Sequence, residues 1–246
     1  MKKKVIRRIL IVLLILCSII GIALLLIAPV KNYVRNGIRE RNIDIAESAI
    51  GEGNGPVTVV VPASDFLKVN GEDGEGEWSD IDLSEYEVNG TVELTLIGLI
   101  EIPCIDLQEP IYDECSRIAL RYGAGRFPDS ANIGEEGNTI IFGHRNNKSK
   151  TFFWQLESLA EHIGDEVIVT TTYGEVRRYT IAYTVYASDE EIDQYLRSDF
   201  TDTEQLCVAT CGYGRDPYDS SIYRVHNTIF IAVCVPSDEY KSNGEF

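Results

Sequence analysis

The chain has 246 residues, of which 44% are hydrophobic and 25% charged, and its formal net charge at pH 7 is −17. This length accommodates one domain of ordinary size with appendages, and the composition is typical neither of a disordered chain nor of a disulfide-rich scaffold. Nucleic-acid binding needs clustered Lys and Arg on the surface, so no nucleic-acid partner is expected for so acidic a protein.

The charge is divided unevenly along the chain. Residues 1–41 hold nine Lys or Arg and one Glu, for a net charge of +8, whereas the rest of the chain carries −25. Within the basic part, residues 9–30 carry no charge and consist mainly of Leu and Ile. A helix of this length, at about 1.5 Å per residue, crosses a hydrocarbon core of roughly 30 Å.

A cleaved signal peptide is the alternative interpretation of residues 9–30. The apolar stretch is long for one, however, and no small-x-small cleavage site clearly follows it. We therefore predict an uncleaved transmembrane anchor at 9–30, preceded by a basic cytoplasmic tail at 1–8. The acidic body is expected on the extracellular face of the cell membrane, tethered by this single span.

Residues 31–90 are predicted to form a juxtamembrane stalk and an acidic linker. Residues 31–43 are basic, but between 44 and 90 Lys68 is the sole base and Gly is frequent, most of all at Gly71–Glu77. Such a composition buries too little apolar surface to offset the entropy of ordering it. A calcium loop is the alternative, although the spacing does not match an EF-hand.

From Thr91 onward, β-strand patterns dominate. Many short apolar or alternating runs, separated by turn residues and with few helical patterns between them, are typical of an all-β sandwich or barrel. One short helix is predicted at 152–162, where Phe153, Leu156 and Leu159 fall on one face. The predicted strands are 91–102, 105–112, 138–142, 166–172, 178–187, 205–210 and 227–235.

Cys211 is the candidate nucleophile among the six cysteines. It ends a predicted strand and is followed by a Gly-Tyr-Gly-Arg-Asp-Pro loop, so its thiol is expected to be rigidly held and accessible. Cys17 lies in the predicted span, and the others lie in or beside apolar runs, where a free Cys usually behaves as a small buried hydrophobe. A Cys104–Cys115 disulfide remains open, whereas any bridge to Cys211 would disable the nucleophile.

His144 and Arg224 occupy similar positions at other strand ends. His144 follows the predicted strand at 138–142, and Arg224 precedes the last strand. A Cys, a His and an Arg at three strand ends are compatible with one catalytic cleft. Each also has a structural alternative, namely a buried thiol, a surface histidine and a surface arginine.

The chain resembles the sortase family over residues 96–235. The resemblance rests on the order His144, Cys211, Arg224, on Phe-Gly-His-Arg around the histidine, and on Val-Ala-Thr-Cys ahead of an Arg 13 residues later. Ile-Pro-Cys-Ile-Asp-Leu from 102 and Ala-Gly-Arg-Phe-Pro from 124 are also similar to family segments. His226 is the alternative base, but its flanks do not match. The single N-terminal anchor resembles class D or class A enzymes more than the pilin-polymerising class.

The resemblance implies a closed β-barrel of about eight strands with one or two short helices at 91–236, followed by a C-terminal tail at 237–246. It implies a membrane-anchored cysteine transpeptidase and endopeptidase of Gram-positive bacteria. This enzyme would cleave a Leu-Pro-x-Thr-Gly-like sorting signal between Thr and Gly through a thioester, and would transfer the surface protein to an amine of the peptidoglycan precursor. Cys211 would be the nucleophile, His144 the general acid and base, and Arg224 the oxyanion stabiliser.

No cofactor is expected, although calcium modulation remains open. The acidic segment 188–202 corresponds to the family's recognition region, and its carboxylates would bind a cation, repel acidic substrates or simply form a solvated helix or loop. The functional alternative is a non-catalytic, membrane-tethered acidic β-domain that acts as a binding module. The order of the residues excludes two other cysteine enzymes, because papain-like proteases place Cys before His and L,D-transpeptidases keep the two close in sequence.

Overall fold

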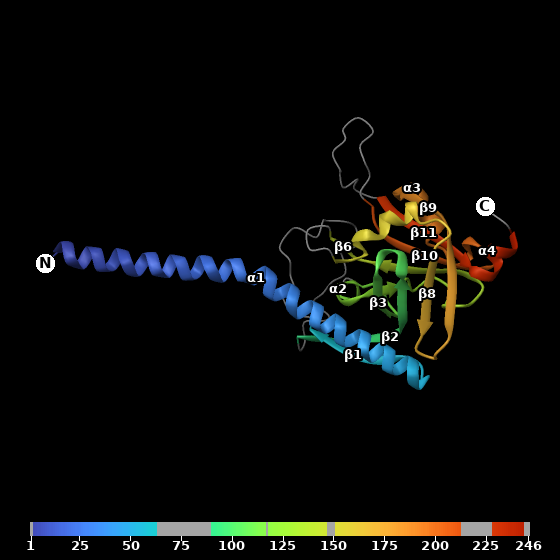
Figure 1. Cartoon of the computed structure of the whole chain (residues 1–246), viewed down its shortest axis with the longest axis horizontal. Helices are drawn as coiled ribbons and strands as arrows, with labels where there is room; N and C mark the ends of the chain where they lie inside the picture. The colour runs from blue at the N-terminus through green and yellow to red at the C-terminus, as the bar shows by residue number, and fades with distance from the viewer. Residues whose placement is uncertain (1, 63–89, 117, 147–150, 213–227, 244–246) are drawn as a thin grey trace, which may run out of the picture. The chain divides into compact units, whose positions relative to one another are not determined.

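The computed structural model describes residues 2–62, 90–116, 118–146, 151–212 and 228–243 (Figure 1). The chain divides into two compact units, residues 1–37 and residues 38–246. Helix α1 (Lys2–Glu52) contributes its N-terminal part to the first unit and its C-terminal part to the second. The predicted acidic linker core at Gly71–Glu77 lies outside the described residues.

The first unit is the N-terminal part of α1. The predicted span at 9–30 lies in this helix. Over the described residues, no helical stretch is both long enough and apolar enough to cross a membrane. Residues 23–29, inside the predicted span, are among the positions whose side chains the structure does not describe.

The second unit is a closed barrel of eight strands, as predicted. The strands are hydrogen-bonded in the order β2, β3, β4, β5, β10, β11, β9, β8, and β8 pairs back onto β2 to close the barrel. The pairs β3–β4 and β5–β10 are parallel and the others antiparallel. The strands are β2 (Thr91–Ile102), β3 (Leu107–Tyr112), β4 (Ala124–Arg126), β5 (Gly137–Gly143), β8 (Glu166–Thr171), β9 (Val176–Ser188), β10 (Glu204–Cys211) and β11 (Thr228–Pro236).

Strand β10 shows how the barrel is packed on both faces. Leu206 and Val208 point into the barrel core, to which each of the eight strands contributes a buried apolar side chain. Cys207 and Ala209 point outward, into a second apolar cluster with residues of β5, β9 and β11. Because successive side chains of a strand alternate between faces, a strand covered on both sides has a continuous apolar sequence.

The end of α1 and a short strand, β1 (Val57–Pro62), pack against the barrel. Arg39 Nε lies 2.6 Å from Glu109 Oε2, whose side chain is 2% exposed, and Asn42 Nδ2 donates to the Tyr112 hydroxyl at 2.8 Å. A carboxylate this buried requires a charged partner. Residues 38–62, which the sequence assigns to the stalk and linker, therefore belong to the compact unit of the barrel.

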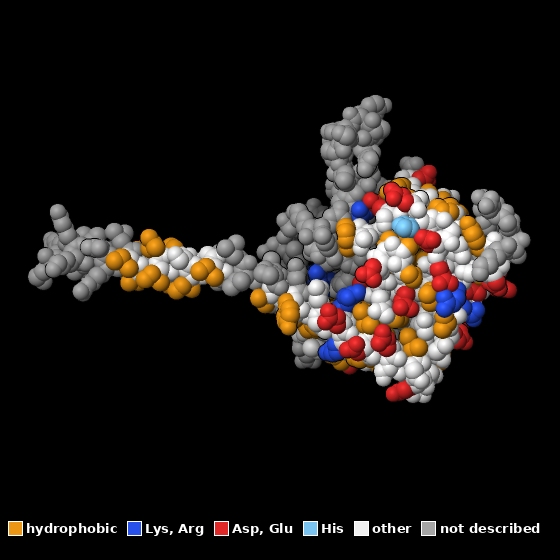
Figure 2. Space-filling view, in the orientation of Figure 1, with side chains coloured by type: hydrophobic (Ala, Val, Ile, Leu, Met, Phe, Trp, Pro, Cys, Tyr) orange, Lys and Arg blue, Asp and Glu red, His pale blue; other side chains and the backbone are white. Residues whose placement is uncertain are grey.

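The described residues contain more helical segments than the one or two short helices predicted. The predicted helix at 152–162 is present as η5, a 3-10 helix, and α3 begins with a capping box in which Ser188 and Glu191 bond reciprocally. The C-terminal helix α4 lies in the predicted tail. These segments are α2 (Ala119–Tyr122), α3 (Asp189–Tyr195), α4 (Ser237–Asn243), η4 (Pro103–Ile105), η5 (Phe153–Glu161) and η6 (Ser198–Phe200). On the face in Figure 2, Asp and Glu side chains are scattered over the barrel.

Candidate active site

The structure brings Cys211 and His144 to the ends of two adjacent strands. Strands β5 and β10 run parallel, with Phe142 paired to Ala209. Cys211 is the last residue of β10, and His144 directly follows the last residue of β5, so each lies two positions beyond this pair. Neighbouring strands lie about 4.8 Å apart, so we expect these two residues, separated by 67 positions in the sequence, to lie near each other.

Strand alternation predicts that these two side chains lie on one face. Ile140 and Phe142 on β5, and Cys207 and Ala209 on β10, all belong to the outer apolar cluster. Positions two apart on a strand share a face, so Cys211 lies on the same face as Ala209, and we expect His144, one residue beyond β5, to follow the face of Phe142. Cys211 is exposed and His144 is half-buried. A thiol open to solvent beside an imidazole is the arrangement that nucleophilic catalysis by cysteine needs.

Buried contacts hold the two strand ends together. Thr210, which is 1% exposed, donates from its hydroxyl to the Gly143 carbonyl oxygen at 2.8 Å. This bond joins β10 to β5 one residue before Cys211 and one residue before His144. A buried hydroxyl that lost this acceptor would carry the full cost of desolvation, so the contact favours one fixed spacing of the two strand ends.

The chain beyond His144 is also held in place. The His144 carbonyl oxygen accepts from the Phe153 backbone N–H at 3.3 Å, across the hairpin formed by β6 (Arg145–Asn146) and β7 (Thr151–Phe152). Arg145 is buried and pairs with Glu157 of η5, with Nη2 2.8 Å from Oε2. Contacts therefore hold both Gly143 and Arg145, and they restrict the backbone of His144 between them.

Gly143 leaves room for one particular side chain. A Cβ atom at this position would lie 1.7 Å from Cδ2 of Phe153, which is fully buried. We predict that Gly143→Ala destabilises the fold by roughly 1–3 kcal/mol, the usual cost of overpacking a core. Urea unfolding measures this. Gly51→Ala is the control, because a Cβ there meets nothing within 4 Å and alanine favours the helix; an equal loss in both variants would contradict the packing argument.

Cys115, Cys207 and Cys234 are poor candidates for the nucleophile. All six cysteines of the chain are free, so the disulfide left open between Cys104 and Cys115 is not formed. Burial raises the pKa of Cys115 to about 11 and that of Cys207 to about 12, and it raises the pKa of Cys234 well above its usual value. These thiols stay protonated at neutral pH, and only a thiolate is an effective nucleophile.

We therefore predict selective alkylation at neutral pH. Within residues 38–246, iodoacetamide will modify Cys211 first and leave Cys207 and Cys234 unmodified in the folded protein. Peptide mapping by mass spectrometry after brief labelling, with and without urea, measures the order of reaction. Faster labelling of Cys115 than of Cys211 would contradict the candidate nucleophile.

Arg224 and the alternative base His226 lie outside the described residues. Three contacts that support the site are not predictable from the sequence: the Thr210–Gly143 bond, the packing of Phe153 over Gly143 and the Arg145–Glu157 pair. No local sequence pattern reveals them, since each joins residues that lie at least ten positions apart. The available signal was the glycine directly before His144.

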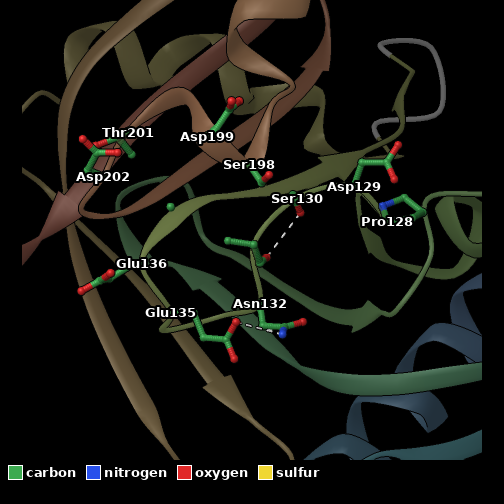
Figure 3. Close-up of a pocket in the computed structure, with 12 residues that line it drawn as sticks. Pro128, Asp129, Ser130, Asn132, Glu135, Glu136, Ser198, Asp199, Thr201 and Asp202 are labelled. Atoms are coloured by element: carbon green, nitrogen blue, oxygen red, sulfur yellow. Dashed lines mark hydrogen bonds between the residues drawn. The ribbon is translucent and has the colours of Figure 1, made fainter.

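An acidic cavity lies at the opposite end of β5 and β10 from His144 and Cys211. A cavity of about 540 Å³ is formed by the loop before β5 and by η6 and the residues that follow it, with five carboxylates among its lining residues (Figure 3). Glu135 accepts from Asn132 there, and Asp199 pairs with Arg197. The seven residues of β5, about 20 Å, separate this cavity from His144. It suits cationic groups, but it is distinct from the candidate active site. Its carboxylates are Asp129, Glu135, Glu136, Asp199 and Asp202.

The acidic segment 188–202 is divided between two environments. Its first part forms α3, where the Glu191 carboxylate caps the helix and has a lowered pKa because Ser188 donates to it. On the other face of α3, Ile192 and Tyr195 pack, together with Leu196, against the outer apolar cluster. The segment is therefore a solvated acidic helix with one apolar face, and Asp199 and Asp202 belong to the acidic cavity.

Comparisons with known proteins identify the family of the chain. The sortase domain family model matches residues 100–234, more than half of the chain. Sortase D5 of Clostridium perfringens is 25% identical over 57% of this chain and 78% of its own, with a TM-score of 0.45. Sortase A of Corynebacterium diphtheriae is 21% identical over 83% and 84%, with a TM-score of 0.48.

A pilus-related sortase C of Group B Streptococcus is 20% identical over 57% of this chain, with a TM-score of 0.47. The match spans 66% of the length of that sortase, slightly less than two thirds. A comparison with curated proteins gives no match. The family model covers β3 to β10 and nearly all of β11, and it includes His144, Cys211 and Arg224. The chain belongs to the sortase family.

Proposed function

We propose that this sortase is a membrane-anchored cysteine transpeptidase that joins secreted proteins to an amine of the cell wall. The observation that carries the proposal is that β5 and β10 are adjacent and parallel, with the exposed Cys211 ending one strand and His144 directly following the other. The substrate proposed is a Leu-Pro-x-Thr-Gly-like sorting signal, cleaved between Thr and Gly.

The first half of the reaction forms a thioester. The Cys211 thiolate attacks the Thr carbonyl carbon, and the carbonyl electron pair moves to oxygen. When the tetrahedral intermediate collapses, the C–N bond to Gly breaks and the His144 imidazolium gives its proton to the departing amine. An imidazolium next to the sulfur also raises the fraction of thiolate, because opposite charges stabilise one another.

The second half transfers the acyl group. The nucleophilic amine attacks the thioester carbonyl, neutral His144 removes the proton that the attacking nitrogen must lose, and the sulfur leaves as thiolate. One amide is exchanged for another, so the cycle needs no oxidant, reductant or cofactor. A single histidine thus acts first as acid and then as base.

Arg224 is proposed to stabilise the oxyanion. A guanidinium keeps its charge and offers several donors in a fixed plane, which suits a negative charge that exists only transiently. We predict that Arg224→Lys lowers kcat by about 10²–10³-fold with a smaller change in KM, because the donor acts mainly in the transition state. Steady-state kinetics on a sorting peptide measures this. An unchanged kcat would remove Arg224 from the mechanism.

The exposed part of three half-buried side chains of α3 and its C-terminal end, Ile192, Tyr195 and Leu196, is proposed to receive the apolar part of the sorting signal. They pack against the cluster that contains Phe142, two residues before His144, and Ala209, two residues before Cys211. A Leu-Pro segment laid over these side chains would bury apolar surface and bring the Thr carbonyl to the thiol. This arrangement uses remote binding energy to position the reacting bond.

Membrane anchoring is proposed from the first unit. The described side chains from Ile11 to Ile22 are largely exposed, with Leu14 at 69%, and Figure 2 shows apolar side chains along this part of the helix. A contiguous exposed apolar surface of this kind marks a membrane or protein contact. We propose that 9–30 spans the membrane, with 1–8 inside and the domain at 91–236 on the extracellular face, as in class D or class A enzymes.

A peptide assay tests the proposed function. The protein is incubated with a Leu-Pro-x-Thr-Gly peptide and a small amine such as triglycine, and the products are identified by mass spectrometry. We expect release of the fragment that begins with Gly and a new amide between Thr and the amine. Binding of the peptide without either product would favour the alternative, a non-catalytic binding module.

A further inference from the structure

A second cluster of reactive side chains lies apart from Cys211 and His144. Cys104, His162 and Asp165 each offer one ligand atom, and the three atoms lie within 4.8 Å of one another. Cys104 lies in η4, after β2; His162 follows η5; and Asp165 directly precedes β8. Strands β2 and β8 pair to close the barrel, and we call this pairing the barrel seam. The cluster lies beside it.

We propose that Cys104, His162 and Asp165 form a zinc-binding site. Thiolate sulfur, imidazole nitrogen and carboxylate oxygen are the three donors that proteins use for Zn²⁺, at about 2.0–2.3 Å from the metal. Tetrahedral ligands at these distances lie about 3–4 Å apart. The observed spacing therefore needs only small side-chain rotations, and the fourth position is left for water.

The backbone around the cluster is already ordered for this role. The Asp165 N–H donates to the His162 carbonyl oxygen at 3.1 Å, which forms a tight turn, and the Ile181 N–H donates to the Asp165 carbonyl oxygen at 2.9 Å. His162 Nδ1 lies 2.8 Å from Asp165 Oδ2. Two of the three ligands thus come from one fixed turn, so metal binding requires little further ordering of the chain.

The electrostatics of the cluster favour a divalent cation. A Zn²⁺ ion between the Cys104 sulfur and the Asp165 carboxylate would stabilise both groups as anions. Zinc binding would then release the thiol proton to solvent and form a sulfur–zinc bond. One thiolate and one carboxylate neutralise the charge of Zn²⁺.

The site is accessible from solvent. The His162 side chain is 33% exposed and that of Asp165 is 49% exposed, while Cys104 is half-buried. A bound metal would link η4, the end of η5 and the start of β8 across the barrel seam. We therefore expect zinc to stabilise the folded barrel rather than to take part in the reaction at Cys211, because a ligand that binds only the folded state raises its stability.

Metal titration of the full chain in detergent tests the proposal. The experiment uses the Cys211→Ala background, so that Cys211 cannot supply the sulfur ligand, with Zn²⁺ and its spectroscopic substitute Co²⁺ as probes. We expect one metal per chain, a thiolate-to-cobalt charge-transfer band and a higher thermal unfolding midpoint with Zn²⁺. Cys115→Ala, which removes another half-buried thiol, should change none of these.

Variants of the three ligands give the decisive result. Cys104→Ala should remove the charge-transfer band, and His162→Ala should weaken metal binding by at least about tenfold. If Cys104→Ala fails to fold, Asp165→Asn keeps the volume of the side chain and the thiol, and it should also weaken binding. Absence of stoichiometric binding, or a band that persists in the folded Cys104→Ala protein, would overturn the proposed site. Neither result depends on transpeptidase activity.

Discussion

Cys211→Ala will abolish conversion of a Leu-Pro-x-Thr-Gly peptide and leave the barrel folded. The thiol is exposed at the last position of β10, so its loss removes few packing contacts. Without sulfur no thioester can form, and we expect the rate to fall by at least about 10⁴-fold, as for other enzymes that lose their nucleophile. Peptide turnover, with circular dichroism as a check of the fold, measures both parts of the prediction.

Cys115→Ala is the matched control for this experiment. Cys115 is half-buried and packs against the same outer cluster, but burial keeps its thiol protonated. This variant should retain activity within a few-fold of the unmodified protein. Substantial turnover by Cys211→Ala, or its loss in Cys115→Ala, would assign the nucleophile to a different residue.

His144→Ala will have the second-largest effect. His144 is proposed to donate a proton in one half-reaction and to accept one in the other, and general acid–base catalysis typically contributes about 10²–10⁴-fold. We expect the rate constant of each half-reaction, and therefore kcat, to fall by that factor. We also expect the bell-shaped dependence of kcat/KM on pH to lose the limb that reports the imidazole.

The variant His226→Ala separates the two candidate bases. It should keep both the rate and the pH profile, because His144 is the proposed base: it follows β5, the strand that runs parallel to and beside β10, which ends at Cys211. If instead the activity and the imidazole limb disappear in His226→Ala and persist in His144→Ala, the base is His226. Measuring the two variants side by side removes the effect of differences between preparations.

Long apolar runs made most of the barrel predictable. The strand predicted at 91–102 matches β2 at both ends, because Pro103 ends its alternating pattern. Strand β4 has only three residues, one of them Gly125, and carries no pattern. Strand β1, Val57–Pro62, does have a β-branched run, but the acidic, Gly-rich sequence around it favoured a linker. Its pairing with β2 is a long-range contact that no local pattern encodes.

The candidate site was predictable to a similar extent. Position at a strand end, with a loop after it, marks Cys211 as held and accessible, and the flanks of His144 resemble those of the family histidine. The sequence cannot show that β5 and β10 are adjacent and parallel. The Thr210–Gly143 bond and the Arg145–Glu157 pair arise only from that arrangement. The supporting contacts depend on which strands pair in the fold, which the sequence does not show. The reacting residues can be recognised from their residue type and local sequence.

The mass of the intact protein after incubation with a sorting peptide, without an amine, tests the central claim most directly. A transpeptidase that acts through Cys211 will gain the mass of the peptide portion ending at Thr, and digestion will locate the adduct on Cys211. Hydroxylamine should remove it, as expected of a thioester. A peptide that is cleaved with no adduct on the protein, or an adduct located on another cysteine, would contradict the account.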